Sequence, residues 1–293
     1  MKTLWALEPF HQDTAKIQMM YSLIKQFSPA ENEVDIGFIA TRDIQSLNLA
    51  FDVPANERYT KYPTRIIAKN LLKAKIPVHQ QNILVRDVDT ISTTKAVQSF
   101  LDLAKKQKSK LLAIFTQDKK DFIKFTLGSF AETAMELSPQ NLLIVSPNVK
   151  PISKLSTIFY ASDFQEKNKS DILEMLDLSN HLKSKIVIYH HSQELALLKK
   201  DKKNTDLLKH KKNLDQFCDW IQDQARLKKA KVKIILDSSL LSVSESILKA
   251  AKKEKAQLIA VTAKTGNLKA MFTGSTTRQV VRSSEVPVLV LKN

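Results

Sequence analysis

The sequence predicts an α/β protein made of two tandem domains, each a doubly wound parallel sheet with helices on both faces. Apolar runs of strand length alternate with amphipathic helical stretches along the chain, as parallel sheets require. The order of elements in the first half returns in the second. With 293 residues, 43% of them apolar, the chain is long enough for two cores of ordinary domain size.

The first half contains strand-like apolar runs separated by helical stretches. The expected strands are LWAL (4–7), VDIGFIA (34–40), QNILVRD (81–87), KLLAIFT (110–116) and NLLIVSP (141–147). The expected helices cover 14–27, 65–75 and 95–107. Within the last of these, Val97, Phe100, Leu101 and Ala104 form an apolar stripe at helical spacing.

The second half continues in the same way. Its expected strands are TIFYASD (157–163), KIVIYHH (185–191), KVKIILDS (231–238), QLIAVTA (257–263) and VPVLVLK (286–292). A helix should begin after Ser242, because Ser242 and Glu245 have the spacing of a capping box. A linker is expected around residues 148–156, where Pro147 and Pro151 bracket a polar stretch, which gives domains at 1–149 and 150–293.

A shift of 146 residues superimposes the two halves without a gap over their last elements. The strand at 111–117 then aligns with that at 257–263. The Gly-Ser pairs at Gly128 and Gly274 coincide, and so do Ser138 and Ser284. Each half therefore ends in a strand, a loop, Gly-Ser, a short helix and a strand, which indicates a duplicated domain.

Glycine and cysteine counts exclude several common functions. The chain has only four glycines, so it contains neither a dinucleotide fingerprint nor a Walker loop. Its one cysteine, Cys218, excludes an intramolecular disulfide and a thiolate-rich metal site. No apolar run is long enough to span a membrane, and Glu8 and Asp13 come too early for a signal peptide. A cytoplasmic protein is expected.

The C-terminal stretch AQLIAVTAKTGNLKAMFTGSTTRQVVRSSEVPVLVLKN (256–293) resembles the C-terminal signature of the universal stress protein family. TIFYASDFQEKNKSDILEMLDLSNHLKSKIVIYHH (157–191) is similar to the opening segment of that family. The first half resembles it less, since Glu8 stands where the family usually has Asp. The resemblance implies a bacterial stress-response protein, with five strands in the order 3-2-1-4-5 in each domain. It also implies that the two domains pair through their last strands and that homodimers form in the family.

ATP-binding members of the family that this chain resembles have a similar loop, with the pattern Gly-x2-Gly-x9-Gly-Ser/Thr. In the second half, Val261 and Lys264 occupy the first two glycine positions and Gly274 keeps the third. In the first half, Phe115 and Asp118 replace the same two glycines. Glycines matter here because backbone N–H groups must approach phosphate oxygens closely. No ATP is expected in the degenerate N-terminal domain.

The C-terminal domain leaves ATP binding open. The resemblance places Asp163 near the adenine and ribose, and Gly274, Ser275 and Thr276 at a helix N-terminus able to hold an anion. Lys264 would add a positive charge near a phosphate. The competing interpretation is that Gly-Ser only caps the helix and Asp163 only stabilises a turn. No cofactor is certain from the sequence.

No catalytic or metal-binding residues are expected. His190 and His191 are adjacent in a strand and should point to opposite faces, so they cannot serve one metal site. No G-x-S-x-G motif accompanies the serines and histidines. The absence of these patterns favours a protein that binds rather than one that catalyses.

The net charge of +16 concentrates around the segment at 195–217, which is rich in lysine. Such a surface neutralises phosphates of nucleic acid or anionic lipid. It lacks the aromatic residues and the motif of a sequence-reading module, so a solvated face is the preferred interpretation.

The preferred function is a non-enzymatic regulatory protein of the universal stress type that binds a partner or a small ligand at the carboxyl ends of its strands. A nucleotide-binding switch in the C-terminal domain is the first alternative. A basic binder of nucleic acid or an anionic surface is the second.

Overall fold

The computed structural model describes residues 1–10, 14–30, 33–41, 44–48, 50–54, 57–77, 82–89, 91–116, 127–146, 149–201, 203–263 and 275–292. The chain divides into two units, Met1–Ser153 and Lys154–Leu291, and each is described by itself. The boundary expected from the sequence, between residues 149 and 150, lies four residues earlier. Because the two units are not placed relative to one another, the expected pairing of their last strands stays a prediction.

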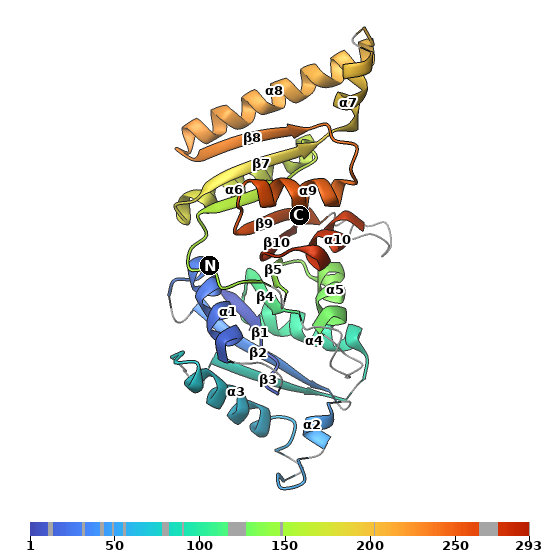
Figure 1. Cartoon of the computed structure of the whole chain (residues 1–293). Helices are drawn as coiled ribbons and strands as arrows, with labels where there is room; N and C mark the ends of the chain where they lie inside the picture. Colours follow the sequence, from blue (N-terminus) through green and yellow to red (C-terminus); the bar gives the residue numbers. More distant parts are fainter. Residues whose placement is uncertain are drawn as a thin grey trace. The chain divides into compact units, whose positions relative to one another are not determined.

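The first unit is a parallel sheet in the expected order (Figure 1). Its described strands are β1 (Thr3–Ala6), β2 (Val34–Thr41), β3 (Ile83–Val88), β4 (Leu111–Phe115) and β5 (Asn141–Val145), arranged β3-β2-β1-β4-β5. Each neighbouring pair is parallel. Its described helices are α1 (Thr14–Phe27), α2 (Gln45–Asn48), α3 (Lys61–Lys73), α4 (Thr93–Lys106) and α5 (Leu127–Leu137). Helices α1 and α3 pack together, and so do α4 and α5.

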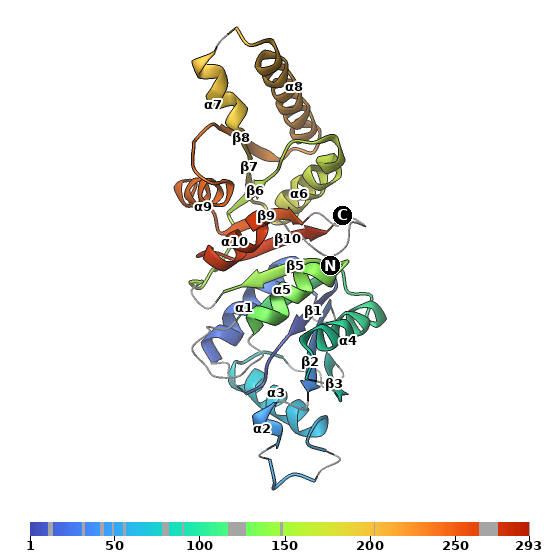
Figure 2. The same ribbon diagram turned by 90° about the vertical axis from the view of Figure 1, so that its right-hand side faces the viewer.

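The second unit repeats this topology. Its described strands are β6 (Thr157–Ala161), β7 (Lys185–His191), β8 (Lys231–Asp237), β9 (Leu258–Ala263) and β10 (Val288–Lys292), arranged β8-β7-β6-β9-β10. Its helices in the described ranges are η3 (Glu166–Asn168), α6 (Lys169–His181), α7 (Gln193–Lys200), α8 (Thr205–Leu227), α9 (Val243–Lys253) and α10 (Ser275–Ser283). Helices α6 and α8 cover one face and α9 and α10 the other (Figure 2). The expected strand order 3-2-1-4-5 and the helices on both faces are confirmed in both units.

The duplication extends to individual hydrogen bonds. In the first unit, the Ser138 hydroxyl accepts from the Gln140 N–H and donates to the Gln140 carbonyl, both at 3.0 Å. In the second, the Ser284 hydroxyl makes the same two bonds to Val286, at 3.2 and 2.6 Å. Both serines are buried. The two serines that coincide in the sequence therefore stabilise the same turn before the last strand of each unit.

Some helix boundaries differ from the expected ones. Helix α3 begins at Lys61 rather than at residue 65, and its first turn contains Pro63. Proline is tolerated there because the first N–H groups of a helix have no partner within the helix. The expected start of α9 is confirmed, since Ser242 and Glu245 form both hydrogen bonds of the capping box. No described helix is long and apolar enough to cross a bilayer.

Five helices end at a lysine in the left-handed region, where glycine is usual. These lysines are Lys75, Lys108, Lys183, Lys229 and Lys255, with φ between 53° and 55°. At the end of α4, the Lys108 N–H donates to the Lys105 carbonyl and the Ser109 N–H to the Ala104 carbonyl. This pair of bonds defines the Schellman motif. An L-residue in this conformation costs about 1–2 kcal/mol, so the chain ends these helices with lysine at some cost in stability.

We predict that Lys108→Gly raises the stability of the protein by about 0.5–1 kcal/mol, because glycine adopts the left-handed region without a steric penalty. Lys105→Gly, inside the last turn of α4, should instead destabilise by about 1 kcal/mol. Thermal unfolding of both variants beside the unmodified protein measures the difference. A loss of stability in Lys108→Gly equal to that in Lys105→Gly would contradict the cost assigned to this conformation.

Candidate functional site

Strand β6 lies at the point where the order of the second sheet reverses. It pairs in parallel with β7 on one side and with β9 on the other. The connections leave β6 and β9 in opposite directions. In open α/β sheets, ligands bind in the crevice at the carboxyl ends of two such strands. The register pairs Ala161 with Val261, so the residues that follow both strands lie at the same edge.

Asp163 lies at this edge, two residues after β6. The side-chain amide of Asn168, at the end of η3, donates a hydrogen bond to its Oδ1. The preceding Ser162 N–H donates to the Tyr189 carbonyl at 2.9 Å, which holds the start of the turn against β7. The turn-stabilising role considered for Asp163 is therefore present, and its role toward a ligand stays a prediction.

The other expected site residues fall into three groups. Val261 lies within β9, where its side chain is 4% exposed and belongs to the core. Thr276 is half-buried in the first turn of α10, and Ser275 begins that helix. Lys264 and Gly274 lie outside the described residues, so their place in the candidate site stays a prediction.

A hydrogen-bonded chain, with buried ends at Tyr160 and Asp171 and the half-buried Thr262 between them, joins β6, β9 and α6. The Thr262 hydroxyl, on β9, donates to Asp171 Oδ2 at 2.8 Å, and the Tyr160 hydroxyl, on β6, lies 3.0 Å from the Thr262 hydroxyl. Because Thr262 gives its one proton to Asp171, it accepts from Tyr160. Burial raises the pKa of Tyr160, so it remains a donor. Asp171 is 1% exposed in the first turn of α6, where the helix dipole favours its negative charge.

The sequence analysis did not identify this chain. Thr262 coincides with Thr116 in the duplicated pattern, and that coincidence was the only signal available. In the first unit, however, the Thr116 hydroxyl donates to the Val145 carbonyl at 3.4 Å. Alignment of the halves would therefore have given the wrong partner.

His190 packs in an aromatic stack on the α8 side of β7. Phe164 is stacked between His190 and Phe217, with ring centroids 4.7 and 5.1 Å away. Lys169 lies over the ring of Trp220, 4.9 Å from its centroid. His190 Nδ1–H donates to the Ser162 carbonyl at 3.0 Å, and burial lowers the pKa of the imidazole. His190 is therefore a neutral packing residue at pH 7.

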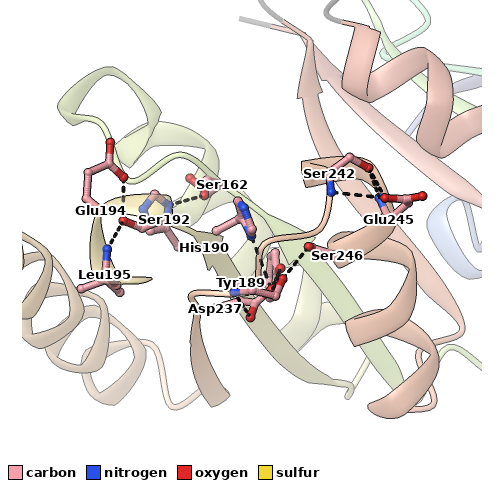
Figure 3. Close-up of polar contacts among 12 residues, drawn as sticks. Ser162, Tyr189, His190, Ser192, Glu194, Leu195, Asp237, Ser242, Glu245 and Ser246 are labelled. Carbon is pink, nitrogen blue, oxygen red and sulfur yellow. Dashed lines mark hydrogen bonds and ion pairs between the residues drawn. The ribbon is translucent and has the colours of Figure 1, made fainter. Parts of the chain in front are cut away.

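His191 points to the other face of β7 and contacts Asp237 at the end of β8. Its Nδ1–H donates to Asp237 Oδ2 at 3.4 Å, and the Tyr189 and Ser239 hydroxyls donate to the same oxygen at 2.6 and 2.8 Å (Figure 3). Burial raises the pKa of Asp237, but the hydrogen bonds from Tyr189, Ser239 and His191 outweigh it and lower the pKa to about 2. The two histidines thus address different sites, as the strand alternation predicts. No group of metal ligands occurs among the described residues.

Ser192, His210 and Glu194 lie close together but do not form a catalytic triad. The Ser192 hydroxyl donates to Glu194 at 2.9 Å and accepts from the Leu195 N–H at 3.4 Å (Figure 3). It also lies 3.1 Å from His210 Nε2. Glu194 approaches the same nitrogen of His210, at 3.9 Å, whereas a triad carboxylate orients the other ring nitrogen. Ser192 is also 2% exposed and caps α7. This hydroxyl therefore has a structural role.

Cys218 is half-buried on α8. Burial and the carboxylates of Asp215 and Asp219 raise the pKa of its thiol to about 11. The thiol is protonated at neutral pH, so it is a poor nucleophile.

We predict that Asp237→Asn lowers stability by about 1 kcal/mol at pH 7, since hydrogen bonds to a carboxylate are stronger than those to an amide and 27% exposure screens part of the effect. The pKa of Asp237 is about 2 in the folded protein, against 3.8 for an ordinary aspartate. The carboxylate therefore contributes fully above about pH 4, and the difference between the proteins should shrink as the pH falls from 4 towards 2.

Denaturation curves at pH 7, 5 and 3 measure this difference. Asp177→Asn is the control, because Asp177 pairs with Lys228 at 2.6 Å but is 61% exposed, and its loss should change stability by less than about 0.5 kcal/mol. A difference for Asp237→Asn that stays constant from pH 7 to 3 would contradict the lowered pKa.

Known proteins are similar to this chain in sequence over one half and in structure over its whole length. Residues 158–292 match the model of the Universal stress protein family. No curated protein matches the sequence. A universal stress protein from Archaeoglobus fulgidus DSM 4304 has a TM-score of 0.68 at 18% identity, over 99% of this chain and 98% of that one. A protein of unknown function from Pseudomonas aeruginosa PAO1 has a TM-score of 0.59 at 12% identity, over 99% and 92%.

At 18% and 12% identity, the two solved structures show that the fold is similar. The match to the family model shows to which family the C-terminal domain is related. The fold of the whole chain, with its repeated strand order, is that of the Archaeoglobus protein. The C-terminal domain of this chain belongs to the universal stress protein family, and the N-terminal unit repeats its sheet order to make a tandem pair.

Proposed function

We propose that the chain is a non-enzymatic stress-response regulator whose C-terminal domain binds an adenine nucleotide at the carboxyl ends of β6 and β9. One observation carries this proposal. Asp163 follows β6 at the edge where the register also brings the end of β9, which is the point at which sheets of this topology bind ligands. Membership of the domain in the universal stress protein family supports it.

The chemistry of this edge suits a nucleotide. A carboxylate such as that of Asp163 accepts hydrogen bonds from sugar hydroxyls. The N-terminus of α10, with Thr276 in its first turn, supplies N–H donors and a dipole that favours phosphate oxygens. The Tyr160–Thr262–Asp171 chain fixes β6, β9 and the start of α6 next to the ligand, so little order has to be gained on binding.

The N-terminal unit is less suited to the same ligand. After β1, the carboxylate of Glu8 accepts a hydrogen bond from the Phe10 N–H at 3.0 Å. Phe10 then packs against Phe38 and Tyr62, with ring centroids 6.2 and 6.1 Å away. Phe115, at a motif glycine position, is 2% exposed in β4. Aromatic side chains therefore occupy this region of the first unit, and we assign the ligand to the second unit alone.

The polar groups around the crevice favour binding over catalysis. His190 is stacked and neutral, and the Ser192 hydroxyl caps a helix. The Asp171 carboxylate is engaged by Thr262 and has too little exposure to reach a substrate. A general base must come within hydrogen-bond reach of the proton that it removes. A ligand at this edge would therefore be held and released unchanged.

We predict that calorimetric titration of the full chain with ATP gives saturable binding at one site, and that Asp163→Asn weakens it at least about tenfold, the value of one charge-assisted hydrogen bond. Asparagine keeps an oxygen that can accept from Asn168, so the turn should persist. Glu8→Gln, the matched change after β1, should leave affinity unaltered.

Circular dichroism of each variant separates lost binding from lost folding. If titration of the unmodified protein with ATP, ADP or AMP releases or absorbs no heat of binding, the proposal that the site binds an adenine nucleotide is wrong. Equal loss of affinity in Asp163→Asn and Glu8→Gln would refute the assignment to the second unit.

A further inference from the structure

The N-terminal turns of α8 extend past the sheet of its own unit. Helix α8 has 23 residues, but none of its first nine is buried, and its buried residues are Leu214, Phe217, Ile221 and Ala225. Figure 1 shows α8 running along β8, with α7 beside its N-terminal end and beyond the strands. Helices α7 and α8 pack against each other and form a helical hairpin at residues 193–213. The hydrogen bond between the Ser192 hydroxyl, next to the end of β7, and His210 on α8 holds the hairpin against the sheet.

This hairpin carries an excess of lysine. Residues 193–213 contain seven lysines, three acidic residues and no arginine. Lys203, Lys209, Lys211 and Lys212 are exposed. Lys211 pairs with Asp215 at 3.0 Å, with about half of each side chain exposed, so this ion pair contributes little to stability. The lysines therefore project a positive field from the hairpin.

Large apolar side chains are exposed at the same edge. Leu197 on α7 is 52% exposed and Leu208 on α8 is 46% exposed. The loop between β8 and α9 adds Leu240 and Leu241, at 80% and 38%, and Val243, the first residue of α9, is 39% exposed. The Ser192 N–H donates to the Asp237 carbonyl at 2.8 Å, so the hairpin and this loop start side by side. Of the exposed large apolar residues described in this unit, only Leu227 lies elsewhere, at the far end of α8.

We propose that the α7–α8 hairpin and the β8–α9 loop dock peripherally on an anionic lipid surface. Lysines attract acidic headgroups, and the leucines gain free energy by entering the interfacial region. On α8, Leu208 has Lys211 and Lys212 at i+3 and i+4, so all three share a face, and lysine stems can keep their charges at headgroup level while leucine is buried.

Nucleic acid fits this edge less well. A polyanion would engage the lysines but would leave Leu240, the most exposed of these apolar residues, in water. Base recognition relies on arginine forks and on aromatic stacking, and the hairpin sequence has no arginine, phenylalanine, tyrosine or tryptophan. The lipid surface is the partner that satisfies both the charged and the apolar side chains.

The test is flotation of the full-length protein with vesicles of phosphatidylcholine alone or with about 30% phosphatidylserine, at about 0.1 M and about 0.5 M salt. The triple variant Leu208→Ser, Lys211→Gln, Lys212→Gln removes the shared face of α8. The matched control is Leu72→Ser, Lys69→Gln, Lys73→Gln on α3, where Leu72 is 74% exposed between two exposed lysines. Leu240→Ser, in the loop, tests the apolar contribution without changing charge.

We expect binding to acidic vesicles that falls with salt, and little binding to neutral ones. Each lysine near an acidic surface contributes about fivefold to partitioning, so the triple variant should bind at least about tenfold more weakly. Leu240→Ser should bind severalfold more weakly and the α3 control as the unmodified protein, with thermal unfolding unchanged in all variants.

Three results would overturn the proposal. The first is no binding to acidic vesicles at low salt. The second is equal loss of binding in the triple variant and in the α3 control. The third is that a single-stranded RNA binds with higher affinity than the vesicles and that Leu240→Ser leaves both affinities unchanged.

Discussion

The parallel pairing of β6 with both β7 and β9 is the constraint on which the second unit depends. A parallel strand can be reached only by a crossover, so every connection must return over one face of the sheet. All the loops that follow strands then collect at one edge, with the helix N-termini facing them. The Tyr160–Thr262–Asp171 chain stabilises this edge by joining the two central strands to the start of α6. Asp163, the Asp237 cluster and the start of the lysine-rich hairpin all follow strands of this sheet at the same edge.

The scarcity of glycine links the composition of the chain to its fold and to its charge. Without glycine, five helices end in Schellman motifs closed by lysine, which adds positive charge near the negative end of each helix dipole. The same scarcity extends to the phosphate-loop pattern expected from the family resemblance. Val261 and Lys264 stand at its first two glycine positions. A ligand would therefore rely on Asp163 and the start of α10 more than on close backbone approach.

Much of the fold could be predicted from the sequence because it depends on local periodicity. The apolar runs become strands with ends shifted by a few residues, Ser242 caps α9, and the coincident Ser138 and Ser284 make the same turn. The start of α3 was missed because Tyr62 and Pro63 give no strong helix signal in isolation. The Asp237 cluster and the Asp171 chain were missed because they join residues 46 and 91 positions apart, which no local pattern relates. Of the candidate site, Asp163 follows β6 at the expected edge, whereas Val261 is a core residue.

Native mass spectrometry of the purified full-length chain tests the central claim most directly, because it detects a ligand carried through purification without assuming which nucleotide it is. Ligand binding at one crevice predicts a single additional mass equal to that of one adenine nucleotide, released on denaturation. A mass equal to that of the chain alone, and unchanged after incubation with an excess of adenine nucleotides, would contradict the account. The function would then have to depend on the surfaces of the protein.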